Sequence, residues 1–366
     1  MAKYIAFHLP QYHSFPENEK WWGEGFTDWV NVKKAKPLFP GHLQPNVPLG
    51  EVYYDMMFSE TRKWQAELAK KYGLYGFCYY HYYFKGKLLM EKPLDLLLKE
   101  KGIDFPFCLC WANEPWTRAW DGKTSTVLMP QDYGDVLDWE KHFDYLLPFF
   151  QDSRYICVEG KPVFVIYRTN NIPNCDEMLS YFDRQCKVNG FSGIYICEEL
   201  NTFQGEPVCK YSSAVIAFEP ANVQRDRSKL SKAMTLLKGK FVARDVKKKL
   251  KIFDYNKVWN KIHHQVYHTR GKKLFYGAFV AWDNTPRKGN DGAVYLNASP
   301  EEFGKNLKIV NQKADDEGSE FVFINAWNEW AEGAYLEPDE RNRYACLEAV
   351  KASKICNRYE DEDVHK

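Results

Sequence analysis

Two glutamates three positions apart, Glu329 and Glu332, give this sequence its clearest chemical signal. They close the run Phe321-Val-Phe-Ile-Asn-Ala-Trp-Asn-Glu-Trp-Ala-Glu-Gly333, whose apolar first part is typical of a strand buried on both faces. If the chain turns helical there, the two Cβ atoms lie roughly 5–6 Å apart on one face. A retaining glycoside hydrolase uses two carboxyls about 5–5.5 Å apart, so the spacing indicates that chemistry. The alternative is a polar helix start with acids near the positive end of its dipole.

The residues around the pair suit acid–base work on a sugar. Cleavage of a glycosidic bond needs one protonated carboxyl for the leaving oxygen and a second group on the anomeric side. Burial beside apolar walls and mutual repulsion move the pKa values of two acids apart, and Trp327 and Trp330 would supply such walls. Asn328 is expected to hydrogen-bond a substrate hydroxyl or to orient one acid.

Polar and aromatic residues also follow other apolar runs of the chain. An amphipathic ring beside a polar group suits the apolar face and hydroxyl rim of a sugar. The indoles can equally pack inside the fold, and the pair Asn113-Glu114 can equally anchor a loop. The predicted substrate-binding residues are His8, Tyr12, His13, Trp22, His81, Tyr82, Trp111, Asn113, Glu114, Trp116, Trp282, Asp283, Asn328 and Trp330.

Three of these histidines, His8, His13 and His81, are also candidates for metal ligands. However, the spacing of His8 and His13 is not a recognised ligand spacing, and no compact His, Asp or Cys cluster accompanies it. Hydrogen bonds to sugar hydroxyls, or a structural role, are therefore favoured. We expect no metal and no cofactor.

Eight apolar runs separated by helix-like segments predict an α/β fold, a single (β/α)₈ TIM barrel with long βα loops. A parallel barrel gathers the carboxyl ends of its strands at one rim, where the candidate residues would converge. A doubly wound open sheet is the alternative, but no G-x-G-x-x-G or Walker pattern accompanies these runs. The predicted strands are residues 4–7, 74–80, 107–112, 162–167, 193–197, 214–218, 274–280 and the run from 321.

The segments between the strands are predicted as follows. A long loop spans 21–48, and loops of that length in a compact domain are usually functional. Ser299, Pro300 and Glu302 have the types expected at N-cap, N1 and N3 of a helix. The other predicted helices are near 58–72, 91–101, 135–150, 175–188 and 341–356.

One catalytic domain is expected over residues 1–356, with a basic insertion at about 221–253 and a charged C-terminal tail at 357–366. Residues 225–251 carry eleven Lys or Arg against two Asp. A solvated helical flap is one interpretation. The other is contact with an anionic polymer or a membrane surface, worth about 1 kcal/mol per basic residue.

Overall composition excludes several partner classes. Fifty basic residues balance 49 acidic ones, so no net field favours nucleic acid. The ten cysteines show no Cys-x-x-Cys pair, which fits a reducing compartment. No signal-peptide core begins the sequence, and no apolar stretch approaches the roughly 20 residues of a membrane span. A soluble, cytoplasmic protein is therefore expected.

Five motifs in order resemble the WbsX-like proteins, glycosyltransferases of bacterial surface-polysaccharide loci whose domain is similar to glycoside hydrolase family 99. The motifs are His8-Leu-Pro-Gln-Tyr-His13, Trp22-Gly-Glu-Gly-Phe-Thr-Asp-Trp29, Phe77-Cys-Tyr-Tyr-His81, Cys110-Trp-Ala-Asn-Glu114 and Ala326-Trp-Asn-Glu-Trp-Ala-Glu-Gly333. The resemblance covers about residues 3–350. It differs at Ala331, where family 99 has His, and at Pro115, where the WbsX-like pattern has Asn.

This resemblance implies a (β/α)₈ enzyme that needs no metal or cofactor. Glu332 would be the general acid/base, and Glu329 would deprotonate the 2-hydroxyl of the substrate, giving a 1,2-anhydro sugar and overall retention. We therefore expect a retaining glycoside hydrolase acting on a bacterial polysaccharide or glycan. A glycosyltransferase of surface-polysaccharide biosynthesis and a non-catalytic glycan-binding protein are the alternatives.

Overall fold

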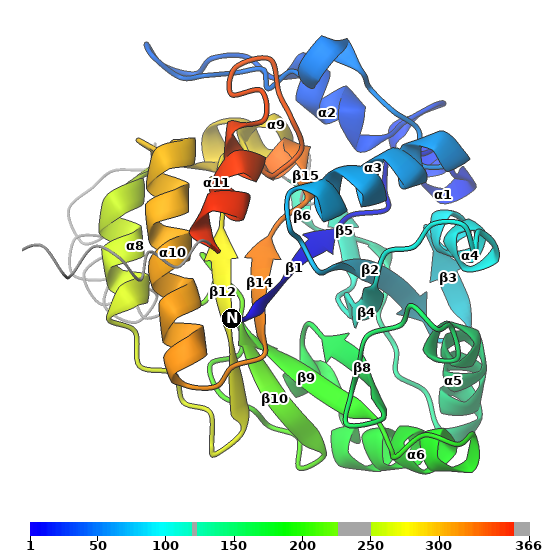
Figure 1. Cartoon of the computed structure of the whole chain (residues 1–366). Helices are drawn as coiled ribbons and strands as arrows, with labels where there is room; N and C mark the ends of the chain where they lie inside the picture. The colour runs from blue at the N-terminus through cyan, green and yellow to red at the C-terminus, as the bar shows by residue number, and fades with distance from the viewer. Residues whose placement is uncertain (119–122, 226–249, 355–366) are drawn as a thin grey trace, which may run out of the picture.

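The computed structural model describes residues 1–118, 123–225 and 250–354 of the chain. Eight parallel strands form a closed ring in which each strand pairs with its neighbours and β1 pairs with both β2 and β14 (Figure 1). The predicted (β/α)₈ barrel is therefore confirmed. In order around the ring the strands are β1 (Lys3–His8), β2 (Gly76–Phe84), β4 (Phe107–Trp111), β8 (Lys161–Ile166), β9 (Tyr195–Leu200), β10 (Ser212–Ala217), β12 (Lys273–Phe279) and β14 (Phe321–Asn325).

The strands form where the sequence is apolar without interruption, because barrel strands are covered on both faces. Every residue of β4 and of β14 is buried, and so is every residue of β1 after Lys3. Closure depends on the register Tyr4↔Val322 on one side of β1 and Ile5↔Gly76 on the other. The carboxyl ends of all eight strands consequently lie at one rim.

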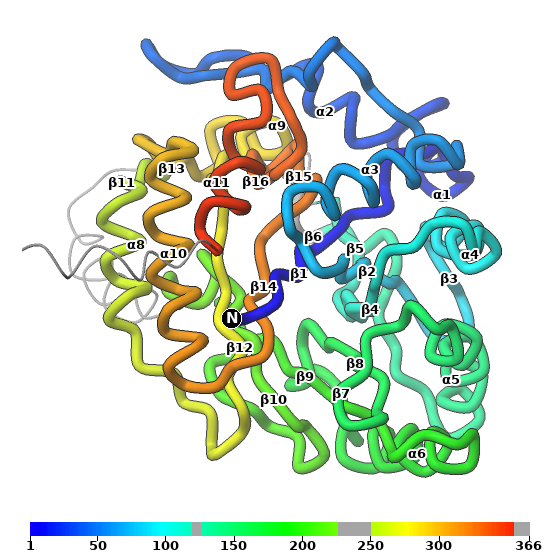
Figure 2. Tube along the Cα trace, viewed as in Figure 1, coloured from blue at the N-terminus to red at the C-terminus, as the bar shows by residue number. Residues whose placement is uncertain are grey.

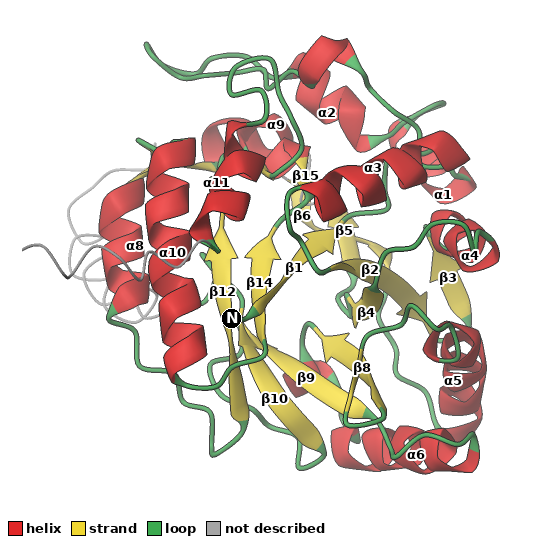
Figure 3. Cartoon of the chain, in the orientation of Figure 1, coloured by secondary structure: helices red, strands yellow, loops and turns green. Residues whose placement is uncertain are grey.

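Helices cover the outside of the barrel (Figure 3). Ser299 caps α10 by accepting a hydrogen bond from the Glu302 N–H, as its residue type predicts. The helix expected at 341–356 begins only at 345. The covering helices are α3 (Ser59–Lys71), α4 (Lys92–Lys99), α5 (Val136–Phe150), α6 (Cys175–Val188), α8 (Tyr255–His263), α10 (Pro300–Asp316) and α11 (Ala345–Ser353).

The predicted loop at 21–48 contains more regular structure than expected. The helix α1 (Pro16–Trp22) begins with proline, and α2 (Asp28–Lys34) follows it over the rim of the barrel (Figure 2). Both are short and mostly polar, so apolar periodicity does not reveal them. α2 packs against two other short helices of the rim, α9 (Thr285–Lys288) and η5 (Trp330–Glu332).

Small strand pairs decorate the same rim and were not predicted, since runs of two to seven residues give little periodic signal. They are β3 (Lys87–Leu89), which pairs with the end of the barrel strand β2, β5 (Trp116–Arg118) with β6 (Lys123–Met129), β11 (Lys251–Asp254) with β13 (Ala293–Leu296), and β15 (Asn328–Glu329) with β16 (Ala334–Tyr335). Most of the predicted basic segment and the whole predicted tail lie outside the described residues. In the part of the chain that is described, no helix is long and apolar enough to cross a bilayer.

Candidate active site

Glu329 and Glu332 leave the end of β14 on one tight turn. Glu329 lies in β15, which pairs with β16, and the 3₁₀ turn η5 carries Glu332 one turn further. Gly333 ends the turn with a φ of 61°, and a Cβ there would come within 2.9 Å of the Asp283 nitrogen. Asp283 can therefore approach closely enough for its N–H to donate to the Glu332 carbonyl at 2.7 Å. This turn fixes the spacing of the two carboxyls.

A buried guanidinium joins the two glutamates. Arg287, on α9, donates from Nη1 to Glu332 at 2.6 Å and from Nη2 to Glu329 at 3.0 Å. The same Nη2 donates to Asp28 of α2 at 2.6 Å. One cation from the segment after β12 thus holds three carboxylates, one from α2 and two from the turn after β14. Such charge-assisted bonds fix geometry well.

Burial distinguishes the two members of the pair. The Glu329 side chain is only 9% exposed, whereas the Glu332 side chain is 23% exposed. Burial raises the pKa of Glu329 to about 8, Arg287 opposes this, and Glu332 adds to the rise. A carboxyl whose pKa lies near neutrality exchanges protons readily under ordinary conditions.

The two carboxyls lie in a cavity of about 450 Å³ at the carboxyl-end rim. Its walls combine indole and phenol rings with a few polar groups, as in sites that bind small polar molecules. Of the residues predicted from sequence, the cavity brings together Trp22, Tyr82, Glu114, Trp116, Trp282, Glu329 and Glu332. The other predicted residues, His8, Tyr12, His13, His81, Trp111, Asn113, Asp283, Asn328 and Trp330, do not line it.

The three histidines are buried with partners inside the protein. His8 donates from Nε2 to Gln65 at 3.1 Å, and His13 donates from Nδ1 to the Pro10 carbonyl at 2.9 Å. His81 shares a 2.9 Å hydrogen bond with His142 of α5. Burial lowers the pKa of His8 to about 3, and that of His81 likewise to about 3. These placements agree with the structural role, one of the two alternatives that the sequence left open for the histidines.

Asn328, Tyr12 and Trp330 fix the backbone around Glu329 and Glu332 through buried hydrogen bonds. The Asn328 amide accepts from the Leu9 N–H at 2.8 Å and donates to the Leu9 carbonyl at 3.0 Å. The Tyr12 hydroxyl donates to the Asn328 carbonyl at 2.6 Å and lies 3.2 Å from the Trp330 nitrogen. Trp330 donates its indole N–H to Glu337. These three residues thus hold β15 against the end of β1. For Asn328 this agrees with the expected orientation of one acid, since β15 carries Glu329.

At the end of β4, Asn113 anchors a loop, which is the alternative that the sequence left open. Its amide donates to the Arg168 carbonyl at 2.9 Å and accepts from the Arg168 N–H at 2.8 Å. The Trp111 indole donates to the Tyr83 carbonyl and is fully buried. Glu114 does reach the cavity, where it forms an ion pair with Arg168.

Sequence reasoning missed Arg287 and Asp28, the residues that organise the carboxyls. Arg287 lies just past the end of β12, four residues after the predicted Asp283, and that position was the only signal for it. Asp28 lies within a motif that was recognised but not assigned a role. The Asp283 side chain accepts hydrogen bonds from His42 and Gln44 and lines a different cavity from the two glutamates. Across the described residues, no group of three or more His, Cys, Asp or Glu could hold a metal ion.

Glu199, at the end of β9, gives a prediction about stability. Its Oε1 accepts the Cys110 thiol, whereas its Oε2 has no hydrogen-bond partner within the described structure. Burial raises the pKa of Glu199 to about 8. Because the folded pKa exceeds the unfolded one, the neutral acid stabilises the fold below about pH 4.5, and this stabilisation is lost as the pH rises to about 8.

We therefore expect Glu199→Gln to melt several degrees higher than the parent at pH 8.5 and to differ less at pH 5.5. Thermal melts at the two pH values measure this, with the exposed Glu67→Gln as the matched control. An equal shift at both pH values would contradict the protonation argument.

A profile of the family described as Glycosyltransferase WbsX matches residues 4–350. Two curated relatives from Xanthomonas campestris pv. campestris, strains B100 and ATCC 33913, each named "Uncharacterized protein WxcX", are 35% identical over 97% of this chain. The alignments cover 51% of each relative, so the chain spans about half the length of these proteins.

Solved structures share the fold. A GH99 endo-alpha-mannosidase from Bacteroides thetaiotaomicron aligns over 96% of both chains with a TM-score of 0.54 and 13% identity. A structure titled "Glycoside hydrolase-like protein" aligns over 97% of this chain and 94% of its own, with a TM-score of 0.56 and 13% identity. At this identity the likeness concerns the barrel architecture.

Proposed function

This chain belongs to the glycosyltransferase WbsX family of carbohydrate-active enzymes, and from that premise we propose that it is a retaining glycoside hydrolase. Its substrate is a bacterial polysaccharide or glycan, and its working pair is Glu329 and Glu332. The observation that carries the proposal is the placement of both carboxyls, joined by Arg287, in one cavity walled by aromatic rings.

The environment of each carboxyl supports a division of labour. Glu329 is the deeper acid, and its pKa of about 8 makes its ionised form a strong base for a carboxylate. Glu332 is the more exposed acid, so a leaving oxygen can reach it from the open cavity. We assign Glu329 to the 2-hydroxyl of the sugar and Glu332 to the glycosidic oxygen.

In the first step Glu329 takes the proton of the 2-hydroxyl while O2 attacks C1. The bond from C1 to the leaving oxygen breaks, and Glu332 gives that oxygen its proton. In the second step Glu332 takes a proton from water, whose oxygen attacks C1 and opens the 1,2-anhydro ring. O2 recovers its proton from Glu329. Two inversions at C1 give net retention.

The rate should depend on pH in a way set by Glu329. In Glu332→Gln acting on a glycoside whose leaving group needs no proton, the first step requires only that Glu329 be ionised. The rate of that step is therefore expected to fall by about tenfold per pH unit below about 8 and to level off above it. Initial rates between pH 5.5 and 9 measure this, with stability monitored at each pH. A rate that is constant from pH 6 to 8 would remove Glu329 from the proposed role.

The function is tested by incubating the purified protein with a panel of bacterial polysaccharides. Newly released reducing ends report hydrolysis, and NMR of the first-formed product reports its anomeric configuration. The proposal expects new reducing ends with the configuration of the substrate. Release of the inverted anomer would refute the paired mechanism.

Transfer to a sugar acceptor is the second candidate, favoured by the family's description as glycosyltransferases. The same carboxyls would open the same intermediate with an acceptor hydroxyl in place of water. The panel is therefore repeated with sugar-nucleotide donors and saccharide acceptors. Consumption of a donor together with a lengthened acceptor, without new reducing ends, would establish transfer.

A further inference from the structure

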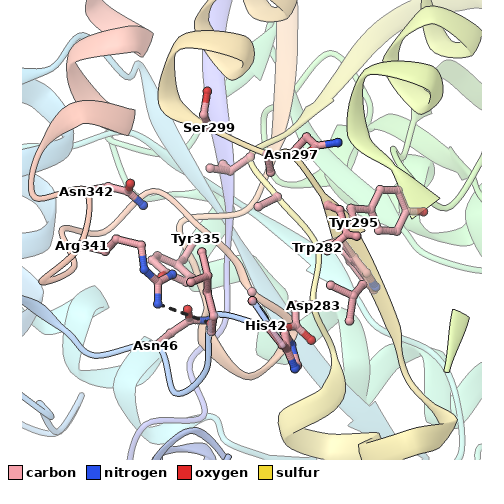
Figure 4. A pocket seen from close by; sticks show the side chains of 18 of the residues that line it. His42, Asn46, Trp282, Asp283, Tyr295, Asn297, Ser299, Tyr335, Arg341 and Asn342 are labelled. Atoms are coloured by element: carbon pink, nitrogen blue, oxygen red, sulfur yellow. Dashed lines mark hydrogen bonds and ion pairs between the residues drawn. The ribbon is translucent and has the colours of Figure 1, made fainter. Parts of the chain in front are cut away.

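A second cavity of about 490 Å³ lies beside the one that holds the glutamates. Loop 39–46, the end of β13 and the segment that follows β16 enclose it (Figure 4). Trp282 lines both cavities, and the turn of η5 divides them, since Glu332 lines the first and Gly333 the second. Ligands bound in the two cavities would therefore both contact the indole of Trp282.

Two polar side chains of this second cavity have bonding capacity that the protein does not use. Asn46 is 7% exposed, and no hydrogen bond of its amide is found in the described part of the chain. Arg341 lies at the exposed mouth of the cavity and makes one long hydrogen bond, from Nη2 to the Leu43 carbonyl at 3.4 Å, and no ion pair with a described residue. Figure 4 shows Arg341 and Asn46 on one side of the space and Trp282 on the other.

The acid that lines this cavity does not compete for Arg341. One oxygen of Asp283 accepts from His42 Nε2 at 2.7 Å and from Gln44 at 2.6 Å. The other accepts from the N–H and the hydroxyl of Thr285 at 3.0 and 2.6 Å. His42 Nδ1 accepts the Leu38 N–H, so its Nε2 carries the hydrogen donated to Asp283. All the strong acceptor positions of Asp283 are therefore occupied.

The remaining groups match a sugar unit with a negative charge. An indole provides a face for the CH groups of a pyranose ring, and side-chain amides both donate to and accept from hydroxyls. A guanidinium without a carboxylate partner prefers a planar carboxylate or a phosphoryl group, which it binds through two N–H groups. Besides Asn46, the amides at this cavity are Asn297 and Asn342.

We propose that the second cavity binds a sugar unit bearing an anionic group, a carboxylate or a phosphoryl, with Arg341 as its partner. This inference rests on the proposed action on a glycan, and it adds that the substrate is acidic beside the bond that reacts. Neutral glycans would leave the Arg341 guanidinium unpaired.

Calorimetry on the intact protein tests the proposal with three probes of known composition. The probes are tetragalacturonate, glucose 6-phosphate and a neutral mannotetraose, each measured at low and at 0.5 M salt. At least one acidic probe is expected to bind at least tenfold more tightly than mannotetraose, and salt should weaken its binding. Tighter binding of the uronate or of the phosphate identifies which anion the site prefers.

Three variants locate the site. Arg341→Gln is expected to abolish the preference for the acidic probe. Arg343→Gln removes an exposed arginine two positions away that does not line the cavity, and should retain the preference. Lys288→Gln removes an exposed cation of the first cavity and should also retain it. An unchanged preference in Arg341→Gln, or equal binding of acidic and neutral probes, overturns the proposal.

Binding is measured without turnover, so the two proposals fail separately. A protein that hydrolyses no glycan but prefers acidic probes through Arg341 retains this site and loses the proposed function. A protein that hydrolyses a neutral glycan without any such preference retains the function and loses the site.

Discussion

Glu329→Gln and Glu332→Gln are each expected to lower kcat/KM by about 10²- to 10⁴-fold, the range for loss of a general acid or base. Glutamine keeps the shape of the side chain and one of its acceptor oxygens but cannot ionise. Both variants should therefore bind the glycan with an affinity close to that of the parent. Steady-state kinetics and calorimetry with one substrate measure the two quantities separately.

The leaving group distinguishes the two roles. The dinitrophenolate of a dinitrophenyl glycoside leaves without needing a proton. Glu332→Gln should therefore recover most of its first-step rate on such a substrate. Glu329→Gln should not recover, because formation of the anhydro ring still lacks its base. Glu348→Gln on the exposed face of α11 is the matched control and should retain full activity. Full activity in both active-site variants, with binding intact, would favour a glycan-binding protein with a contaminating hydrolase.

Arg287→Met is expected to lower the free energy of unfolding by about 3–5 kcal/mol, the cost of removing one partner from a buried ion pair. The reason is the number of carboxylates that depend on it, namely Asp28, Glu329 and Glu332. Activity should fall as well, since the two glutamates lose the group that fixes their separation. Urea unfolding and kcat/KM on the same preparation measure both effects.

The loss of stability in Arg287→Met should depend on pH. Unpaired carboxylates can take up protons at low pH, so the loss of stability in Arg287→Met should be smaller at pH 5 than at pH 8. Adding Asp28→Asn to Arg287→Met removes one of the unpaired charges and should restore part of the stability. Lys288→Met, at an exposed neighbour in the same cavity, is the control and should change stability little. A loss independent of pH would indicate a packing role for Arg287.

The barrel could be predicted because its strands are long apolar runs, and α10 because Ser299 is a recognisable cap. The turn that carries Glu329 and Glu332 could be predicted for the same reason, since it follows the last of those runs directly. Short elements such as α2 and α9 could not, because two turns of polar helix have no apolar stripe. Arg287 was missed as a result, although it lies at the expected rim.

The histidines show a second limit. Side chains in a strand point alternately to its two faces, so Tyr80 and Tyr82 reach the cavity and His81 points outward to His142. When both faces of a strand are buried, the sequence gives the alternation but not which set faces inward. His8 lies on the outward face of β1 in the same way, against Gln65 of α3. A polar residue at the end of a strand therefore predicts a site contact only when its side chain is also known to face inward.

The two hydrogen bonds between Asn328 and Leu9, here called the Asn328 clamp, have a consequence for how the site forms during synthesis. The clamp joins Leu9, directly after β1, to a segment that follows the last strand of the barrel. Asp28, Arg287 and the two glutamates are likewise distributed over nearly the whole chain. A ribosome-bound chain that stops before residue 329 lacks both acids, so the proposed reaction would require the last strand and the turn after it. Two co-expressed halves of the chain, divided between β10 and β12, should regain turnover only when they reassociate and form the contact between Leu9 and Asn328 again.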